Sequence, residues 1–317
     1  MCSFPKLHCR TVNAGHRTQD TGPLIVIAGP TGAGKSDLAL ELAGAVGGEI
    51  VNYDSVQIYR GFDVGSAKPS ADARARVPHH LYDIVDADEE FNAADFARAA
   101  RAVCDDIAAR GRRAILAGGT FFYLRAFLGG LPEMPGRDAG VRARIRALAA
   151  RPRGQARLHR WLSKIDPQSG RRIAPADRHR VERALEVWLV SGRPISSFER
   201  GGEEIPHIKI ALTLPRPRLH DAIDRRVDAM YAAGLIDETR RLLERYPRDA
   251  RPFGTIGYRE AVAVIEGTIT RDAAIAETKR RTRAYAKRQL TWLRSERNVH
   301  WLEAGTPNTF AAAMELI

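Results

Sequence analysis

The sequence predicts an α/β protein, with a P-loop-type parallel sheet flanked by helices and an all-helical insert. Short apolar runs such as Leu24 to Ala28 are typical of buried parallel strands. Helix-period segments alternate with these runs along much of the chain, whereas residues 131–202 show helical patterns and no convincing strand. The chain has 317 residues and is 44% hydrophobic, which suits two linked lobes and excludes a disordered chain.

The first elements form a predicted β-α-β unit. Leu24 to Ala28 is a strand, and a glycine-rich turn over 29–34 leads into a helix from Ser36 to Val46 with an apolar residue at every fourth position. Glu49 to Tyr53 is the second strand, so the two strands should run parallel. Asp54 therefore falls at the carboxyl end of the second strand.

The remaining elements follow from the same periods. Further strands are expected over 113–117, 208–214 and 300–302, the last as an edge strand. Helices are expected over 92–110, 121–128, 141–150, 155–162, 177–190, 218–233, 236–246 and 271–296. The predicted organisation is a disordered extension (1–22), a P-loop α/β core with C-terminal helices (23–130 and 203–317) and a helical insert (131–202).

The charge pattern predicts a polyanionic partner. The net charge is +12, and residues 142–200 hold 15 basic against 5 acidic side chains, while residues 271–300 hold 9 against 3. Concentrated positive charge of this kind favours nucleic acid, and the alternative is a set of solvated helix faces. Three cysteines without metal-ligand spacing, and no apolar run long enough for a bilayer, favour a cytoplasmic protein without a membrane partner.

A phosphate-binding loop is the strongest local motif. The residues Gly29, Pro30, Thr31, Gly32, Ala33, Gly34, Lys35 and Ser36 match GxxxxGK(S/T) between a strand and a helix. Glycines let successive N–H groups point inward, Lys35 offers a charge to a terminal phosphate, and the Ser36 hydroxyl is suited to Mg²⁺. The alternative is a tight turn that binds nothing. No strand ending in aspartate follows, which weakens the case for an ATPase or GTPase.

Asp54 should share one crevice with this loop, because ligands bind beyond the carboxyl ends of parallel strands. A carboxylate beside phosphate is repelled unless something offsets the charge, so its presence suggests a role such as taking a proton from a nucleophile. The alternative is a turn or helix cap formed by Asp54 and Ser55.

Several segments together resemble one family. Residues 51–69 resemble the DSxQxYxGxDxGTAKP signature of the tRNA dimethylallyltransferases, also called tRNA isopentenyltransferases. Residues 78–83, 91–96, 118–124, 180–194, 254–260 and 286–294 resemble further family segments in the family's order. The resemblance covers residues 24–302, with small departures such as Ser66 in place of the usual threonine.

This resemblance implies transfer of a dimethylallyl group from dimethylallyl diphosphate to N6 of adenosine 37. The acceptor lies in the anticodon loop of tRNAs that read codons beginning with U, diphosphate is released, and Mg²⁺ is needed. Asp54 resembles the family's general base, Thr31 to Ser36 its diphosphate cradle, and Arg226 an arginine that assists the diphosphate, with Arg225 left as the adjacent alternative. A monomer suffices, because one chain supplies one crevice.

The resemblance also implies that the helical insert (131–202) contacts tRNA and that tRNA contacts fall in segments 54–57, 177–181, 254–259 and 282–289. The expected contacts are Asp54, Ser55, Val56, Gln57, Thr120, Arg142, Asp177, Arg178, His179, Arg180, Val181, Gly257, Tyr258, Arg259, Lys287, Arg288 and Gln289. Thr120 is equally suited to an N-cap, and Arg180 with Arg183 to a solvated face.

Other side chains favour structural roles. The tryptophans Trp161, Trp188 and Trp292 lie at core-like spacings, and His79 with His80 is better explained by packing than by metal binding. The rival functions are a small-molecule kinase with an incidental basic surface and a non-enzymatic RNA-binding protein with a decayed site. A kinase has no need of a strongly basic insert, and a decayed site would have lost Lys35 or Asp54.

Overall fold

The computed structural model describes residues 22–198 and 205–317, so the predicted extension over 1–22 lies almost wholly outside the described residues. These residues divide into two units, one formed by 22–127 with 205–317 and the other by 128–198. Residues 128–198 begin slightly before the insert predicted at 131–202. Among the residues described, no helix combines the length and apolar content needed to cross a membrane.

A parallel sheet of six strands organises the first unit, in the order β3-β2-β4-β1-β5-β6. The strands are β1 (Leu24–Ala28), β2 (Glu49–Asn52), β3 (His79–His80), β4 (Ala114–Ala117), β5 (His207–Thr213) and β6 (Val299–Glu303). The α/β class is therefore confirmed, and β6 is the edge strand that the sequence predicts. All residues of β2 and β4 are buried, as expected for strands covered on both faces.

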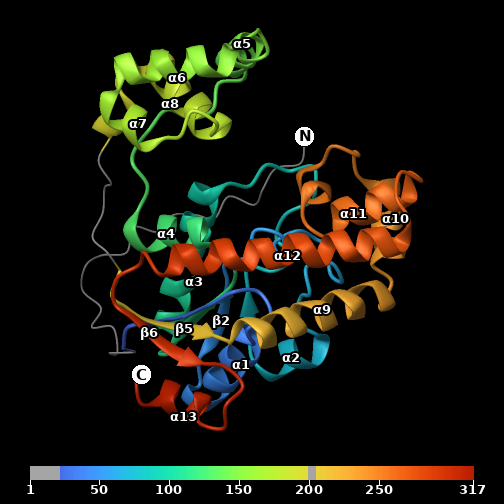
Figure 1. Ribbon diagram of the computed structural model, residues 1–317. Helices are drawn as coiled ribbons and strands as arrows, with labels where there is room; N and C mark the ends of the chain where they lie inside the picture. Colours follow the sequence, from blue (N-terminus) through green and yellow to red (C-terminus); the bar gives the residue numbers. More distant parts are fainter. Residues whose placement is uncertain (1–21, 199–204) are drawn as a thin grey trace. The chain divides into compact units, whose positions relative to one another are not determined.

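Helices cover the sheet of this unit. They are α1 (Lys35–Val46), α2 (Ala71–Arg76), α3 (Ala93–Ala109), α4 (Phe121–Gly129, which runs on into the second unit), α9 (Arg216–Ala232), α10 (Leu235–Arg245), α11 (Tyr258–Ile265), α12 (Arg271–Leu293) and α13 (Thr309–Met314). Leu38 and Leu42 of α1 join Ala313 of α13 in one apolar cluster against Ile25 and Ile115 of the sheet. Helix α12 crosses the unit alongside α9 (Figure 1).

The second unit is helical and has its own core. Its helices are α5 (Ala139–Ala149), α6 (Gly154–Ile165), α7 (Pro167–Arg172) and α8 (Arg178–Ser191). Ile145, Leu158, Leu162 and Leu185 form its centre. Glu186 is fully buried there and binds two arginines, described below.

The differences from the predicted elements concern short segments and ends. Helices α2 and α7 and strand β3 were not predicted, because two to six residues carry too little periodicity to recognise. Helix α11 was also missed, although Glu260 forms the capping interaction with the N–H of Gly257. The long basic helix was predicted to reach Glu296 but ends at Leu293.

Candidate active site

The loop between β1 and α1 is shaped for an anion. Gly29 and Gly32 have φ values of 145° and 84°, a region that favours glycine. A Cβ on Gly29 would lie 2.9 Å from the carbonyl oxygen of Leu212, so the loop passes closely over β5. Helix α1 begins at Lys35, and its first N–H groups have no partner within the helix, which makes them available to an anion.

A cavity of 440 Å³ lies beside this loop and reaches α1 and α9. Its lining includes Gly34, Lys35, Ser36, Lys68 and Arg226. Backbone N–H groups, a helix N-terminus and cations therefore share one cavity, which is an arrangement suited to phosphate. This arrangement favours a binding loop over a tight turn that binds nothing.

Lys35 is half-buried and lies near the guanidinium of Arg226. Its Nζ donates to the carbonyl oxygen of Pro30 at 2.9 Å. Burial and, to a smaller extent, the charge of Arg226 lower the pKa of Lys35 from its usual 10.5, Asp54 acts in the opposite direction, and the net pKa is about 7. The pocket therefore holds excess positive potential that a phosphate anion would neutralise.

The structure distinguishes Arg226 from Arg225. Arg226 lines the cavity of 440 Å³ and also a second cavity, whereas Arg225 is exposed. Nη2 of Arg226 is 3.5 Å from the carbonyl oxygen of Ser66, which also accepts a hydrogen bond from Nε2 of Gln57. Burial lowers the pKa of Arg226, while Asp54 raises it.

Asp54 holds its own turn and keeps one oxygen free. Its Oδ1 accepts hydrogen bonds from the backbone N–H of Val56 at 2.8 Å and of Gln57 at 3.4 Å. The capping alternative is thus realised, but by one oxygen only. Among the described residues, none donates a hydrogen bond to Oδ2, so this oxygen is available as a proton acceptor.

The turn after β4 supports the turn after β2. Oγ1 of Thr120 accepts a hydrogen bond from the N–H of Ser55 at 2.9 Å, and it lies 3.0 Å from Oγ of Ser55. The hydroxyl of Thr120 is therefore directed at the Asp54 turn rather than at the start of α4. Thr120 caps α4 only through its backbone oxygen, which accepts from Tyr123 and Leu124.

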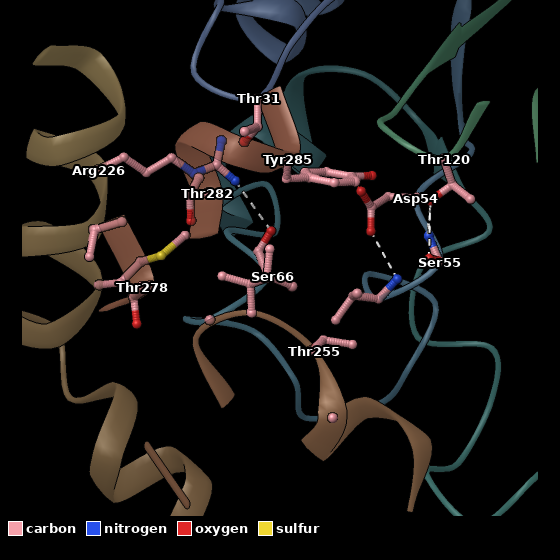
Figure 2. Close-up of a pocket in the computed structure, with 16 residues that line it drawn as sticks. Thr31, Asp54, Ser55, Ser66, Thr120, Arg226, Thr255, Thr278, Thr282 and Tyr285 are labelled. Carbon is pink, nitrogen blue, oxygen red and sulfur yellow. Dashed lines mark hydrogen bonds between the residues drawn. The ribbon is translucent and has the colours of Figure 1, made fainter. Parts of the chain in front are cut away.

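A second cavity, of 290 Å³, joins these elements (Figure 2). Asp54 and Thr120 lie on one side of it, and Arg226 lies on the opposite side in Figure 2. Apolar side chains complete the wall: Val56, Val227, Met230 and Ile256. A cavity with an apolar wall and a few convergent polar groups is suited to a small organic group attached to an anion.

The residues of α12 that line this cavity were not predicted to do so: Thr282 and Tyr285 fall in the segment 282–289 predicted to contact tRNA, and Thr278 lies outside the predicted segments. Thr278, Thr282 and Tyr285 line this cavity from α12. Their spacing of four and then three residues places them on one face of the helix. In the sequence, this row of uncharged polar residues within a basic helix is the pattern that could have identified the cavity-lining face. Burial raises the pKa of Tyr285, and the nearby Asp54 raises it further.

Several residues predicted to contact tRNA are buried in the described structure, so their contacts with tRNA remain predictions. Val181 and Tyr258 are 0% exposed, Gln289 is 2% exposed, and Gly257 is also buried. The hydroxyl of Tyr258 donates to Glu238. Each of these motifs contains both buried and exposed residues, and the resemblance alone does not tell which residues are exposed.

Two predicted cradle or contact groups have partners inside the protein. The N–H of Thr31 donates to Oε1 of Gln289 at 2.8 Å, so it does not face the phosphate cavity. Arg142 contacts the buried carboxylate of Glu186, with Nε 2.8 Å from Oε1. Arg183 binds the same carboxylate. These bonds lower the pKa of Glu186 to about 2.

Five of the predicted contacts are exposed cations, namely Arg178, Arg180, Arg259, Lys287 and Arg288. On α12, Lys279, Arg281 and Arg283 form ion pairs with acidic side chains. Lys287 and Arg288 are exposed and form no ion pair within the described parts of the chain. Further exposed arginines lie on the second unit and near the start of α11: Arg157, Arg160, Arg171, Arg172, Arg178, Arg180 and Arg259. Arg180 and Arg183 therefore differ, because the first is exposed and the second is held internally.

The tryptophans and the histidine pair have packing partners. The ring of Trp292 stacks on Phe121 at 4.6 Å, and Trp161 meets Trp188 edge to face at 5.7 Å. His80 lies 2.6 Å from the carboxylate of Glu49. No group of three or more potential metal ligands occurs within 22–198 or 205–317.

Comparisons with known proteins agree on one family. Residues 57–296 match the family model described as IPP transferase. The chain is 45% identical over 295 residues to a tRNA dimethylallyltransferase of Geobacter sulfurreducens, covering 92% of this chain and 93% of the relative. Among solved structures, it resembles the tRNA isopentenylpyrophosphate transferase of Bacillus halodurans, with 38% identity, a TM-score of 0.69 and coverage of 92% and 94%. It also resembles a eukaryotic dimethylallyltransferase acting on tRNA, with 26% identity, a TM-score of 0.73 and coverage of 92% and 77%.

Proposed function

The chain belongs to the IPP transferase family, and from this premise we propose that its donor is dimethylallyl diphosphate, bound across the two cavities that share Arg226. The protein is a prenyl-transferring enzyme that transfers a dimethylallyl group to adenosine 37 of tRNA. We extend the proposal to tRNAs that read codons beginning with U, to a monomer, and to the cytoplasm as the place of reaction.

The leaving group is assigned to the phosphate loop. Breaking the allylic C–O bond leaves negative charge on the diphosphate oxygens. Lys35, Arg226 and the N–H groups at the start of α1 lie around the cavity of 440 Å³, where they would stabilise this charge as it develops. Thr31 is removed from the cradle, because its N–H donates to Gln289.

The cavity of 440 Å³ also suits Mg²⁺, which would be bound mainly by the diphosphate oxygens and by water. Mg²⁺ in phosphate sites keeps several water ligands and takes few protein groups besides the phosphate oxygens. Ser36 lines the cavity in the first turn of α1, and we propose its Oγ as the protein ligand. When bound, the ion would neutralise part of the charge on the diphosphate.

Asp54 is assigned the role of accepting the proton that the adenosine loses. The exocyclic N6 of adenine forms the new C–N bond and loses one proton, while the C–O bond breaks and its electron pair leaves with the diphosphate. Oδ2 of Asp54 takes this proton in our proposal, because it has no hydrogen-bond donor among the described residues and its side chain lines the cavity of 290 Å³. The apolar side chains of Val56, Val227 and Met230 would enclose the dimethylallyl group.

We propose that the exposed cations bind the backbone of the tRNA. Anticodon loops are single-stranded, so a base leaves its stack at a cost of about a few kcal/mol or less. Lys287 and Arg288 on α12 and the exposed arginines of the second unit are suited to backbone phosphates.

One observation carries the proposal: Lys35 lines one cavity, Asp54 lines the other, and Arg226 lines both. The test incubates the protein with tRNA, Mg²⁺ and labelled dimethylallyl diphosphate, with a tRNA carrying guanosine at position 37 as the control. We expect label in the first tRNA and none in the second. Absence of label, with the γ-phosphate of ATP transferred to a small molecule instead, would support the kinase alternative.

A further inference from the structure

Gln289 joins two loops that are far apart in the sequence. It lies on α12 and is 2% exposed. Its Oε1 accepts the N–H of Thr31 in the phosphate loop at 2.8 Å, and its Nε2 donates to the carbonyl oxygen of Gly119 after β4 at 2.9 Å. The hydroxyl of Tyr285, one turn earlier on α12, donates to the same carbonyl at 2.8 Å.

The second loop leads directly to Asp54. Gly119 precedes Thr120, whose Oγ1 accepts the N–H of Ser55 at 2.9 Å, and Ser55 follows Asp54. A Cβ on Gly119 would lie 2.9 Å from Nε2 of Gln289 and 3.1 Å from Oδ2 of Asp54. The absence of a side chain at Gly119 therefore lets the amide and the carboxylate approach its backbone from two sides.

We propose that Gln289 is a positioning residue that sets the phosphate loop at a fixed distance from the Asp54 turn. The inference rests on the proposed roles of the loop and of Asp54, since it concerns how the leaving group and the proton acceptor are aligned. A primary amide is required because one oxygen must accept from Thr31 while one N–H must donate to Gly119. Transfer reactions are sensitive to such alignment, and misplacement by about 1 Å costs roughly a hundredfold in rate.

This role differs from the tRNA contact that the resemblance implies for the same residue. A tRNA contact predicts weaker tRNA binding with an unchanged rate at saturation. A positioning role predicts a lower rate at saturation with unchanged tRNA binding, because both hydrogen bonds of the amide stay inside the protein.

The experiment measures single-turnover transfer at saturating tRNA and dimethylallyl diphosphate for Gln289→Met, which keeps the length of the side chain and removes both hydrogen bonds. We expect a rate lowered by about tenfold to a hundredfold and a tRNA Kd within about twofold of wild type. Thr291→Val is the matched control, because Thr291 lies on the same helix, is exposed and bonds only within that helix. It should behave as wild type.

Gln289→Glu separates lost hydrogen bonds from lost packing. An ionised carboxylate accepts from Thr31 but cannot donate to Gly119, whereas a protonated carboxyl does both. The rate of this variant relative to wild type should therefore rise as the pH is lowered, while that of Gln289→Met stays flat. Asp54 and Tyr285 are the titratable groups beside Gly119, and dividing by the wild-type rate at each pH cancels their contribution.

Gly119→Ala gives an independent variant that leaves α12 intact. Its Cβ would press on the amide of Gln289 and on Oδ2 of Asp54, so we expect a loss of rate at least as large as that of Gln289→Met, with tRNA binding retained. A saturating rate within about twofold of wild type for Gln289→Met, or a rate loss explained fully by tRNA affinity, would overturn the inference. Failure of the wild-type protein to transfer the group would overturn the proposed function instead.

Discussion

Asp54 combines two functions at the scale of single residues. Oδ1 holds the turn through the N–H groups of Val56 and Gln57, and Oδ2 receives no hydrogen bond from the described residues, while the side chain lines the cavity of 290 Å³. The capping interpretation and the catalytic interpretation are thus compatible, because a carboxylate has two oxygens. Because the two oxygens have separate roles, Asp54→Asn can keep the turn and remove only the proton acceptor.

We expect Asp54→Asn to lower the single-turnover rate by about 10²–10⁴-fold, the range for loss of a general base. The amide keeps an oxygen for the turn, so tRNA affinity should stay unchanged. Rates and Kd values are measured side by side, with Asp221→Asn on the exposed face of α9 as control. Near-wild-type turnover by the Asp54 variant would remove this residue from its proposed role.

Lys35 makes diphosphate binding depend on pH. Its pKa of about 7 in the free protein lies below the usual 10.5, so it is largely neutral above pH 7. A bound anion favours the charged form and raises the pKa, so binding takes up a proton. Affinity for inorganic diphosphate should therefore fall as the pH rises above 7.

Calorimetry in two buffers that differ in protonation enthalpy measures this uptake at about pH 8. Lys35→Met should bind more weakly and show no proton uptake from this residue. Identical heats in both buffers for the wild-type protein would contradict the prediction.

Arg226 and Arg225 form a matched pair for the diphosphate end. Arg226 lines both cavities and Arg225 is exposed. Arg226→Gln should lower the saturating rate by about 10²–10³-fold, the range for removing one donor to developing negative charge. Arg225→Gln should leave the rate unchanged, and equal effects of the two substitutions would refute this assignment.

At the scale of elements, α12 has two distinct faces. Gln289, Thr278 and Tyr285 face the protein or the cavity. Lys287 and Arg288 face outward and form no ion pair among the described residues, unlike Lys279 and Arg283. One helix therefore supplies both the site wall and cations suited to RNA.

The double variant Lys287→Gln/Arg288→Gln should weaken tRNA binding and lower the slope of log Kd against log salt by about 2, because two phosphate contacts are lost. The control is Lys279→Gln/Arg280→Gln on the same helix, where both cations have acidic partners. Filter binding at several salt concentrations gives both slopes. An unchanged slope for the first variant would show that these two cations do not contact phosphate.

At the scale of the whole molecule, the net charge of +12 is concentrated in two regions. One lies largely within the second unit, which has its own core around Leu158 and Leu185, and the other lies on α12. Each core keeps its helices folded and leaves several arginines and lysines exposed, of which Lys287 and Arg288 form no ion pair among the described residues. The net charge therefore indicates a polyanionic partner and carries no information about the fold.

Binding of tRNA to the complete protein should weaken by about 10³-fold between 50 and 200 mM salt, the magnitude for roughly six phosphate contacts. Binding of an uncharged adenosine analogue provides the control, because it releases no counterions. A flat salt response for tRNA would contradict the interpretation of the charge.

Local patterns predicted much of the fold and part of the site. The run from Leu24 to Ala28, the loop at 29–36 and the position of Asp54 depend on neighbours in the sequence, and the structure contains each of them. The short elements α2, α7 and β3 were missed because tertiary contacts, rather than periodicity, stabilise a few residues.

The sequence by itself determined the fold class, the family and the phosphate loop, because these depend on backbone preferences and on motifs that are contiguous in the chain. Tertiary structure alone decided that Arg226 rather than Arg225 reaches the cavities, and that Tyr258 and Gln289 are internal. It also brought Thr31, Gly119 and Gln289 together across the fold. The physical reason is that burial and long-range hydrogen bonds depend on which face of each helix packs inward.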